Sequence, residues 1–222
     1  MELNLSTMHR ETRVKTHVLG YGVEKTEVIM ALTQPVMEAG NRLFEKQAAI
    51  LIGSGYRIDL TQVDRDYCKF PNKRYIMYWL HKTGQVPELF GEFYRKTFKN
   101  GGICDLDTTD RLGNPFEYID VFDAVRAIRD AGGLAVLAHP GQQQNFQLIP
   151  KLAEIGLSGL ELNHYSNSVE DREILLDMAD RYNLFLTGGS DYHGRLGRKS
   201  CGVGDILSDV TGMNVICNHV GG

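Results

Sequence analysis

The sequence lacks the features that would point to an oxidising compartment, a membrane or duplex nucleic acid. Its four cysteines are far apart and form no CxxC pair, which argues against both a zinc ribbon and a disulfide framework. The chain opens without a signal peptide, and no apolar run approaches the ~20 residues that a membrane helix needs. A formal net charge of -4 gives no polybasic surface for duplex nucleic acid. We therefore expect a cytoplasmic protein with reduced thiols at Cys68, Cys104, Cys201 and Cys217.

Several familiar nucleotide-binding and hydrolase motifs are also missing. Residues 197–200 lack the glycine that precedes the lysine of a phosphate loop, and residues 202–204 lack the third glycine of a dinucleotide-binding fingerprint. Ser190 is not in a G-x-S-x-G elbow. The acidic residues within 105–110 lack the glycine and terminal glutamate of a calcium loop. These absences argue against a nucleotide cofactor, a serine hydrolase and an EF-hand.

Two stretches instead combine a short apolar run with a polar end. Residues 132–141 contain an apolar run that ends in His139 and a Pro-Gly turn, and residues 184–187 lead in the same way to Asp191 and His193. Such runs are typical of buried parallel strands, and α/β proteins place their chemistry at the C-terminal ends of these strands. The two strand ends therefore predict a metal site.

The length and the apolar content are enough for one α/β domain with an insertion, because 42% of the 222 residues are hydrophobic. A helix is predicted over about residues 24–56. Between residues 59 and 116 the regular pattern is lost, and we interpret this part as an inserted helical subdomain with helices over 74–81 and 88–98. Its aromatic residues favour a hydrophobic core over a surface that stacks nucleobases.

From residue 118 onward helical and strand-like patterns alternate, which predicts a parallel sheet or barrel. The expected strands lie over residues 2–6, 14–22, 134–138, 157–162, 184–187 and 213–220. The expected helices lie over residues 118–131, 146–155 and 169–182. In this order His139 and Asp191 each follow a strand.

Four segments, taken together in this order, resemble the PHP (polymerase and histidinol phosphatase) family of metal-dependent phosphoesterases. They are Glu2, the Thr-His-Val-Leu-Gly-Tyr-Gly segment with His17, the segment that ends in His139-Pro-Gly, and the Gly-Gly-Ser-Asp-Tyr-His-Gly segment with Asp191 and His193. The resemblance covers nearly the whole chain and implies a distorted (β/α)7 TIM-like barrel with a helical insertion. It also implies two or three divalent metal ions (Mn, Zn or Fe) that activate water for the hydrolysis of a phosphate ester.

The resemblance also implies roles for individual residues. The implied metal ligands are Glu2, His17, His139, Asp191 and His193, and the implied catalytic residues among them are His139, Asp191 and His193. The implied substrates are small phosphorylated nucleosides or short oligonucleotides.

Further side chains near the predicted strand ends suggest supporting roles. Arg195, Arg198 and Lys199 follow the last motif and could bind the substrate phosphate, although a solvated basic loop explains them equally well. Glu161 and His164 follow another expected strand, where they could orient metal ligands.

The sequence also departs from the family pattern. Family members begin with His-x-His and Thr-Asp-His motifs, and neither precedes Glu2 here. The resemblance therefore implies a barrel without its first βα units. In such a barrel the strand around Leu3 and Leu5 should be an unpaired edge, open to a partner such as a second copy of the chain. The alternative function is a non-catalytic metal-binding or interaction remnant.

Overall fold

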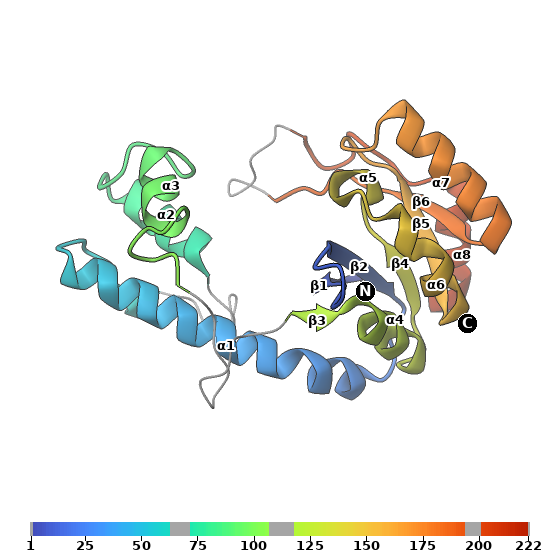
Figure 1. Cartoon of the computed structure of the whole chain (residues 1–222), viewed down its shortest axis with the longest axis horizontal. Coiled ribbons are helices and arrows are strands. Elements are labelled where there is room, and N and C mark those ends of the chain that lie inside the picture. Colours follow the sequence, from blue (N-terminus) through green and yellow to red (C-terminus); the bar gives the residue numbers. More distant parts are fainter. Residues whose placement is uncertain (1, 63–71, 107–117, 194–200, 222) are drawn as a thin grey trace. The chain divides into compact units, whose positions relative to one another are not determined.

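The computed structural model of the chain describes residues 2–62, 72–106, 118–193 and 201–221. They are coloured along the sequence in Figure 1. The chain divides into two units. The sheet unit comprises Met1–Thr33, Tyr118–Tyr192 and Lys199–Gly222, and the helical unit comprises Gln34–Glu117 and His193–Arg198. The boundary falls within helix α1 (Thr26–Gly53), one residue before its internal Pro35.

The sheet unit is built on a mixed, six-stranded sheet in the order β3-β1-β2-β4-β5-β6 (Figure 1). The strands are β1 (Glu2–Met8), β2 (Lys15–Tyr21), β3 (Ile119–Asp120), β4 (Leu134–Leu137), β5 (Leu157–Asn163) and β6 (Phe185–Gly188). β4, β5 and β6 run parallel to one another, as the alternating pattern predicted. The predicted mixed α/β class is therefore confirmed.

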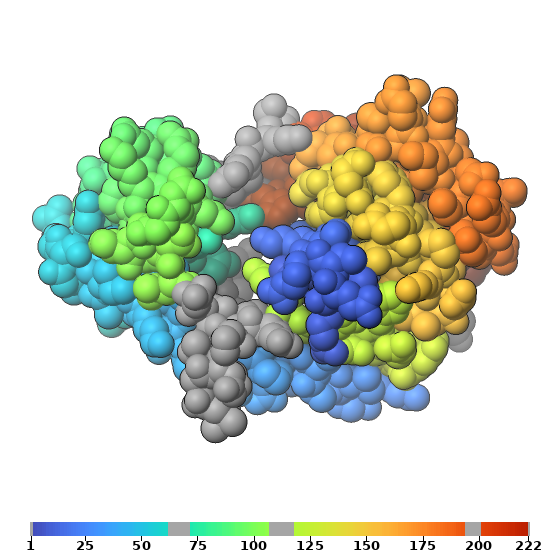
Figure 2. All heavy atoms as spheres, viewed as in Figure 1, coloured from blue at the N-terminus to red at the C-terminus, as the bar shows by residue number. Residues whose placement is uncertain are grey.

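Strand β2 differs from this parallel arrangement, because it runs antiparallel to both β1 and β4. β1 and β2 are antiparallel because only residues 9–14 connect them, whereas a parallel crossover needs a dozen or more residues. The turn is closed by backbone hydrogen bonds from His9 N to Val14 O and from Arg13 N to His9 O, both 2.8 Å long. In Figure 2 the dark blue N-terminal part of the chain, which contains β1, β2 and this turn, is visible at the surface of the sheet unit.

The prediction that β1 is an unpaired edge is wrong only at the C-terminal end of the strand, because in the described part of the chain the pairing with β3 does not extend to Leu3 and Leu5. β1 lies between β3 and β2, and its Thr7 and Met8 pair with Ile119 and Asp120 of β3. The two-residue strand β3 was included in the predicted helix that starts at residue 118. Asp120 ends that strand, because its carboxylate accepts the Phe122 N–H at 2.9 Å and starts the next helix.

The helices of the sheet unit alternate with β4, β5 and β6, as predicted. They are α4 (Val121–Asp130), α5 (Pro140–Gln143), the 3-10 turn η2 (Phe146–Leu148), α6 (Ile149–Glu154), α7 (Val169–Tyr182) and α8 (Val210–Gly221). In α4 the buried residues Val121, Ala124, Val125 and Ile128 follow the helical period. Ser168 and Asp171 form a capping box at the start of α7.

The predicted strand over residues 213–220 is instead part of helix α8. The Asp209 carboxylate accepts the backbone N–H of Thr211 at 2.7 Å and of Gly212 at 3.3 Å, which starts the helix. The buried residues Gly212 and Ile216 are four positions apart, so they lie on one helical face. The β-branched composition of this segment is therefore overridden by its cap and by its packing against β6.

Gly212 should be intolerant of any side chain. A Cβ atom at Gly212 would lie 1.8 Å from the Leu186 carbonyl oxygen, whereas one at Gly40 in α1 would meet nothing within 4 Å. We expect Gly212→Ala to lower the free energy of unfolding by about 1–3 kcal/mol, as overpacking does. The control Gly40→Ala should raise it by roughly 0.5–1 kcal/mol. Urea unfolding measures both, and a neutral Gly212→Ala would contradict the close packing of α8 on β6.

The helical unit has a core of its own. It contains α1 from Gln34 onward, the 3-10 turn η1 (Leu60–Gln62), α2 (Lys73–Lys82) and α3 (Glu92–Phe98). The predicted helix over 74–81 is confirmed, and the one over 88–98 starts later, at Glu92. Aliphatic and aromatic side chains fill this core, including Phe44, Leu51, Met77, Leu80 and Phe98. No helix in the described part of the chain is long and apolar enough to cross a membrane.

Candidate functional site

Two of the predicted histidines lie side by side in the sheet unit. His17 is in β2, and its carbonyl oxygen accepts the backbone N–H of Ala138 at 3.0 Å, directly after β4. The rings of His17 and His139 are 5.0 Å apart between centroids, with an angle of 71° between their planes. The antiparallel pairing of β2 with β4 therefore brings together residues that are far apart in the sequence.

His139 is held in an unusual conformation. It is buried, and its φ of 32° and ψ of 59° place it in the left-handed region, which costs a non-glycine residue about 1–2 kcal/mol. Its Nδ1 lies 2.9 Å from the Gln143 side-chain oxygen. Because that oxygen can only accept, Nδ1 carries the proton and the lone pair of Nε2 remains available to a ligand. Strain of this kind is typical of functional sites.

Glu161 supports this histidine from the next strand. Its carboxylate accepts the backbone N–H of His139 at 2.7 Å, and only 6% of the residue is exposed. Burial raises the pKa of Glu161 to about 7, with smaller contributions from the charges of Asp191 and Glu2, while the His139 N–H opposes the shift. The negative charges of Asp191 and Glu2 thus both disfavour ionisation of Glu161.

A row of aromatic rings continues from His139. The ring of His164, which is fully buried, lies 4.9 Å from that of His139, and the Tyr165 ring lies 4.0 Å from that of His164. The Tyr165 hydroxyl donates to the Asp191 carboxylate over 3.4 Å. Burial and the charge of Asp191 raise the pKa of Tyr165, so this hydroxyl stays a donor near neutral pH. Asp191 is therefore connected to the histidines through neighbouring side chains.

The remaining predicted ligands are Glu2 and His193. Glu2 pairs with Tyr21, four residues along β2 from His17. Burial, together with the charge of Glu2 and a hydrogen bond to it, raises the pKa of Tyr21. His193 is exposed and is grouped with the helical unit. The predicted phosphate-binding residues Arg195, Arg198 and Lys199 lie outside the described residues.

The residues of the sheet unit suit a divalent cation in kind. Imidazole and carboxylate are the ligands that Mn, Zn and Fe accept. The charges of Asp191 and Glu2 disfavour ionisation of the buried Glu161 carboxyl, and a cation would offset these charges. Thr187 of β6 pairs with Glu161 of β5 and is buried, and its hydroxyl has no hydrogen-bond partner among the described residues. In the described part of the chain, however, no three His, Cys, Asp or Glu side chains lie close enough together to hold a metal ion.

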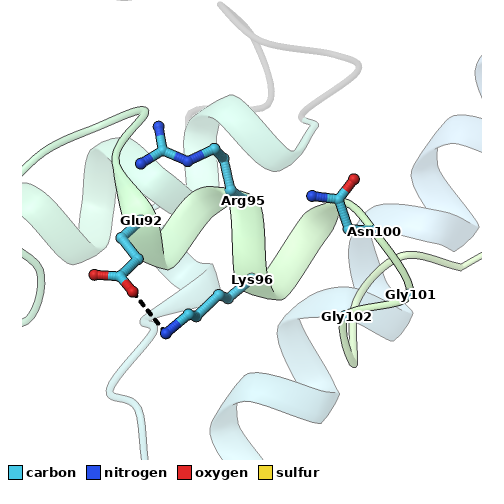
Figure 3. Close-up of a pocket in the computed structure, with 6 residues that line it drawn as sticks. All are labelled: Glu92, Arg95, Lys96, Asn100, Gly101 and Gly102. Atoms are coloured by element: carbon cyan, nitrogen blue, oxygen red, sulfur yellow. Dashed lines mark ion pairs between the residues drawn. The ribbon is translucent and has the colours of Figure 1, made fainter.

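Two surface hollows lie in the helical unit and contain none of these residues. One, of about 480 Å³, is lined by α3 and the turn after it, and Figure 3 shows Glu92 pointing toward Lys96 in a 2.6 Å ion pair. The other, of about 460 Å³, is lined mostly by apolar atoms and includes Tyr56 and Trp79. An exposed ion pair such as that between Glu92 and Lys96 contributes little to stability. Neither hollow is lined by a histidine.

Sequence reasoning anticipated Glu161 and His164 but missed Gln143 and Asn167. Gln143 is four residues after His139, which places it one helical turn away. Asn167 directly precedes the capping residue Ser168 and bonds to the turn after β4. The helical pattern predicted α7 over residues 169–182, but nothing in the sequence identified the partner of Asn167 on another loop.

Two named proteins share sequence with the chain. The phosphoribosyl 1,2-cyclic phosphate 1,2-diphosphodiesterase of Eggerthella lenta is 36% identical over 201 residues, which is 88% of this chain and 73% of that protein. The 3',5'-nucleoside bisphosphate phosphatase of Chromobacterium violaceum is 32% identical over 122 residues, which is 48% of this chain and 43% of that protein. No protein-family model matches the sequence.

Solved structures share the fold. A structure from Bifidobacterium adolescentis, named as a metal-dependent phosphoesterase, superposes with a TM-score of 0.73 at 24% identity. An amidohydrolase from Chromobacterium violaceum, solved with sulfate and without metal, superposes with a TM-score of 0.68 at 20% identity. Each comparison covers 98% of this chain and 76% of the other. At these identities the likeness establishes the fold alone.

Proposed function

Because the chain belongs to the PHP-like phosphoesterase family, we propose that it hydrolyses phosphate esters of small phosphorylated compounds with the help of divalent metal ions. The observation that carries the proposal is the adjacent pair His17 and His139, in a chain 36% identical to a phosphodiesterase over most of its length. The alternative, a non-catalytic remnant, is not favoured because both relatives are named as phosphoesterases.

The proposed substrate is a ribose that carries phosphate esters. One relative is named for a phosphoribosyl cyclic phosphate and the other for a nucleoside bisphosphate, and a phosphorylated sugar is common to both names. Phosphorylated nucleosides and short oligonucleotides, which the resemblance implied, contain the same unit. We also propose that the sheet unit is a distorted (β/α)7 barrel without its first βα units, supported by the TM-score of 0.73 to a phosphoesterase structure.

The proposed metal ligands are His17 and His139, with Glu2, Asp191 and His193 as further ligands. A bound cation would lower the pKa of a water molecule and stabilise charge on the phosphate oxygens. The chain's own contribution is orientation. Gln143 fixes the protonated nitrogen of His139, so that Nε2 faces a ligand.

Hydrolysis of a panel of substrates, measured as inorganic phosphate or as a newly formed phosphate monoester, tests this proposal. The panel contains phosphoribosyl 1,2-cyclic phosphate, a 3',5'-nucleoside bisphosphate and a short oligonucleotide, each assayed with Mn²⁺, Zn²⁺ or Fe²⁺ and with EDTA. We expect metal-dependent turnover of a phosphorylated ribose, and its loss in the His17→Ala, His139→Ala double variant. Turnover that survives both EDTA and the double substitution would refute the proposed site.

The basic residues after the last motif give a separate prediction. If they bind the substrate phosphate, Arg198→Ala should raise KM or lower kcat and leave the free energy of unfolding within about 0.5 kcal/mol. Arg172→Ala, an exposed arginine of α7, is the matched control and should change neither. Kinetic constants and thermal unfolding are measured on both variants. Unchanged kinetics in Arg198→Ala would remove phosphate binding from its roles.

A further inference from the structure

The turn after β4 has a backbone that must be fixed from outside. His139 is in the left-handed region, and Pro140 begins the four-residue helix α5 directly after it. A non-glycine residue keeps such a conformation only where its surroundings determine it. The contacts made by this turn therefore decide where the His139 ring points. In the described part of the chain, the side chains that accept its backbone N–H groups come from β5 and from the loop that follows it.

Glu161 makes the first of these contacts. Its Oε2 accepts the backbone N–H of His139 at 2.7 Å, and both residues are buried. A carboxylate is a stronger acceptor than a neutral oxygen, and burial excludes water that would compete for the N–H. Because β5 lies beside β4 in the sheet, this contact joins the ends of neighbouring strands (Figure 1).

Asn167 makes the second contact and is itself fixed. Its Oδ1 accepts the backbone N–H of Gly141 at 2.9 Å. Its Nδ2 donates to the carbonyl oxygens of Glu161 and Leu162, both at 3.0 Å. One buried amide thus connects the turn after β4 to the backbone at the end of β5, including the backbone of Glu161.

The packing at Gly141 shows how close this approach is. A Cβ atom there would lie 2.7 Å from Oδ1 of Asn167 and 2.5 Å from a carboxylate oxygen of Asp171. Asp171 closes the capping box of α7, so that side of the contact is held by a helix start. A side chain at this position would therefore require Asn167 or Asp171 to move away from the turn.

We propose that Glu161 and Asn167 are positioning residues that hold the backbone of His139 and Gly141 and thereby aim the His139 imidazole beside His17. The proposal rests on the proposed function in one respect, namely that His139 is a metal ligand. Glu161 acts through the His139 N–H, and Asn167 acts through the Gly141 N–H and through the backbone of Glu161. Contact with the substrate is not part of either role.

Paired substitutions at Glu161 test the proposal. Glu161→Ala removes the acceptor, whereas Glu161→Gln keeps an oxygen that can accept the His139 N–H. We expect Glu161→Ala to weaken Co²⁺ binding about 10–100-fold and to lower kcat more than it changes KM. Glu161→Gln should restore most of both. In the metal-free protein, the His139 amide should exchange with solvent much faster in Glu161→Ala than in the parent or in Glu161→Gln.

Asn167 and a packing control complete the design. Asn167→Ala should accelerate amide exchange at Gly141 and weaken Co²⁺ binding by about 10-fold or more. Leu152→Ala removes a fully buried side chain of α6, which packs against β5, and serves as a variant that is destabilised by packing alone. It should leave Co²⁺ affinity and His139 exchange unchanged under folding conditions.

The outcomes separate this proposal from the proposed function. Equal losses of Co²⁺ affinity in Glu161→Gln and Glu161→Ala, with the His139 amide protected in both, would overturn positioning and favour direct ligation by Glu161. A parent chain that binds no Co²⁺ and hydrolyses none of the panel substrates would refute the proposed function. Amide exchange in the metal-free protein would still decide the positioning role of Glu161. Unchanged protection of the His139 amide in Glu161→Ala would overturn that role, and selective loss of protection at His139 would support it.

Discussion

His139→Ala should remove far more bound metal than His193→Ala. His139 is buried beside His17, with Nδ1 held by Gln143 and its backbone held by Glu161, so its ring is oriented before any ion binds. A preorganised ligand contributes more to affinity than an exposed one, because less entropy is lost on binding. We expect His139→Ala to weaken Mn²⁺ affinity by about 100-fold or more. This loss exceeds the roughly 10–100-fold loss that follows when a residue that only hydrogen-bonds to a metal ligand is replaced. His193 is exposed, and its substitution should have a smaller effect.

Metal analysis after dialysis, together with Mn²⁺ titration calorimetry, measures this difference. His81→Ala is the matched control, since His81 is an exposed histidine of α2 in the helical unit. It should retain the metal content of the parent chain. Equal losses in His139→Ala and His193→Ala, or a parent chain without metal, would show that the His17 and His139 pair is not the principal metal site.

Local patterns predicted those elements whose signals lie within a few residues. Residues 169–182 were predicted as a helix and form α7, because the capping box and the apolar spacing agree. The apolar run before His139 was predicted as a strand and forms β4. The tail was predicted as a strand and is α8, because the close fit of Gly212 to Leu186 comes from another part of the chain. Local signals therefore sufficed only where no distant contact opposed them.

The arrangement of the site depends on long-range pairing, which the sequence does not encode in a visible pattern. The resemblance to a family grouped His17 with His139, but their contact depends on the antiparallel pairing of β2 with β4. The pairing of β1 with β2 puts Ser6, rather than Glu2, opposite His17. Glu161 was expected to orient a ligand, and its bond to a backbone N–H required the left-handed turn at His139. Residue types were thus predictable, whereas distances between them were not.

Stability of the metal-free protein should fall as the pH rises through the range in which Glu161 ionises. The folded pKa of Glu161 is about 7, above the 4.5 of a free side chain, because burial disfavours its charged form. The folded state therefore binds this proton more tightly than the unfolded state. The stabilisation is complete below pH 4.5 and is lost as the pH rises through 7, and it amounts to about 3 kcal/mol.

Urea unfolding in EDTA at pH values from 4.5 to 8 measures this effect, because EDTA removes cations that would compete for the carboxylate. Histidines titrate in the same range, so the informative quantity is the difference between the parent and Glu161→Gln, which has no titrating group at this position. We expect the free energy of unfolding of the parent to fall by about 3 kcal/mol more than that of Glu161→Gln across this range. Glu154→Gln, at the exposed end of α6, is the control and should behave like the parent. Parallel pH profiles for the parent and Glu161→Gln would mean that ionisation of Glu161 costs no stability in the folded protein. The pKa of Glu161 would then give no support to a cation beside this carboxylate.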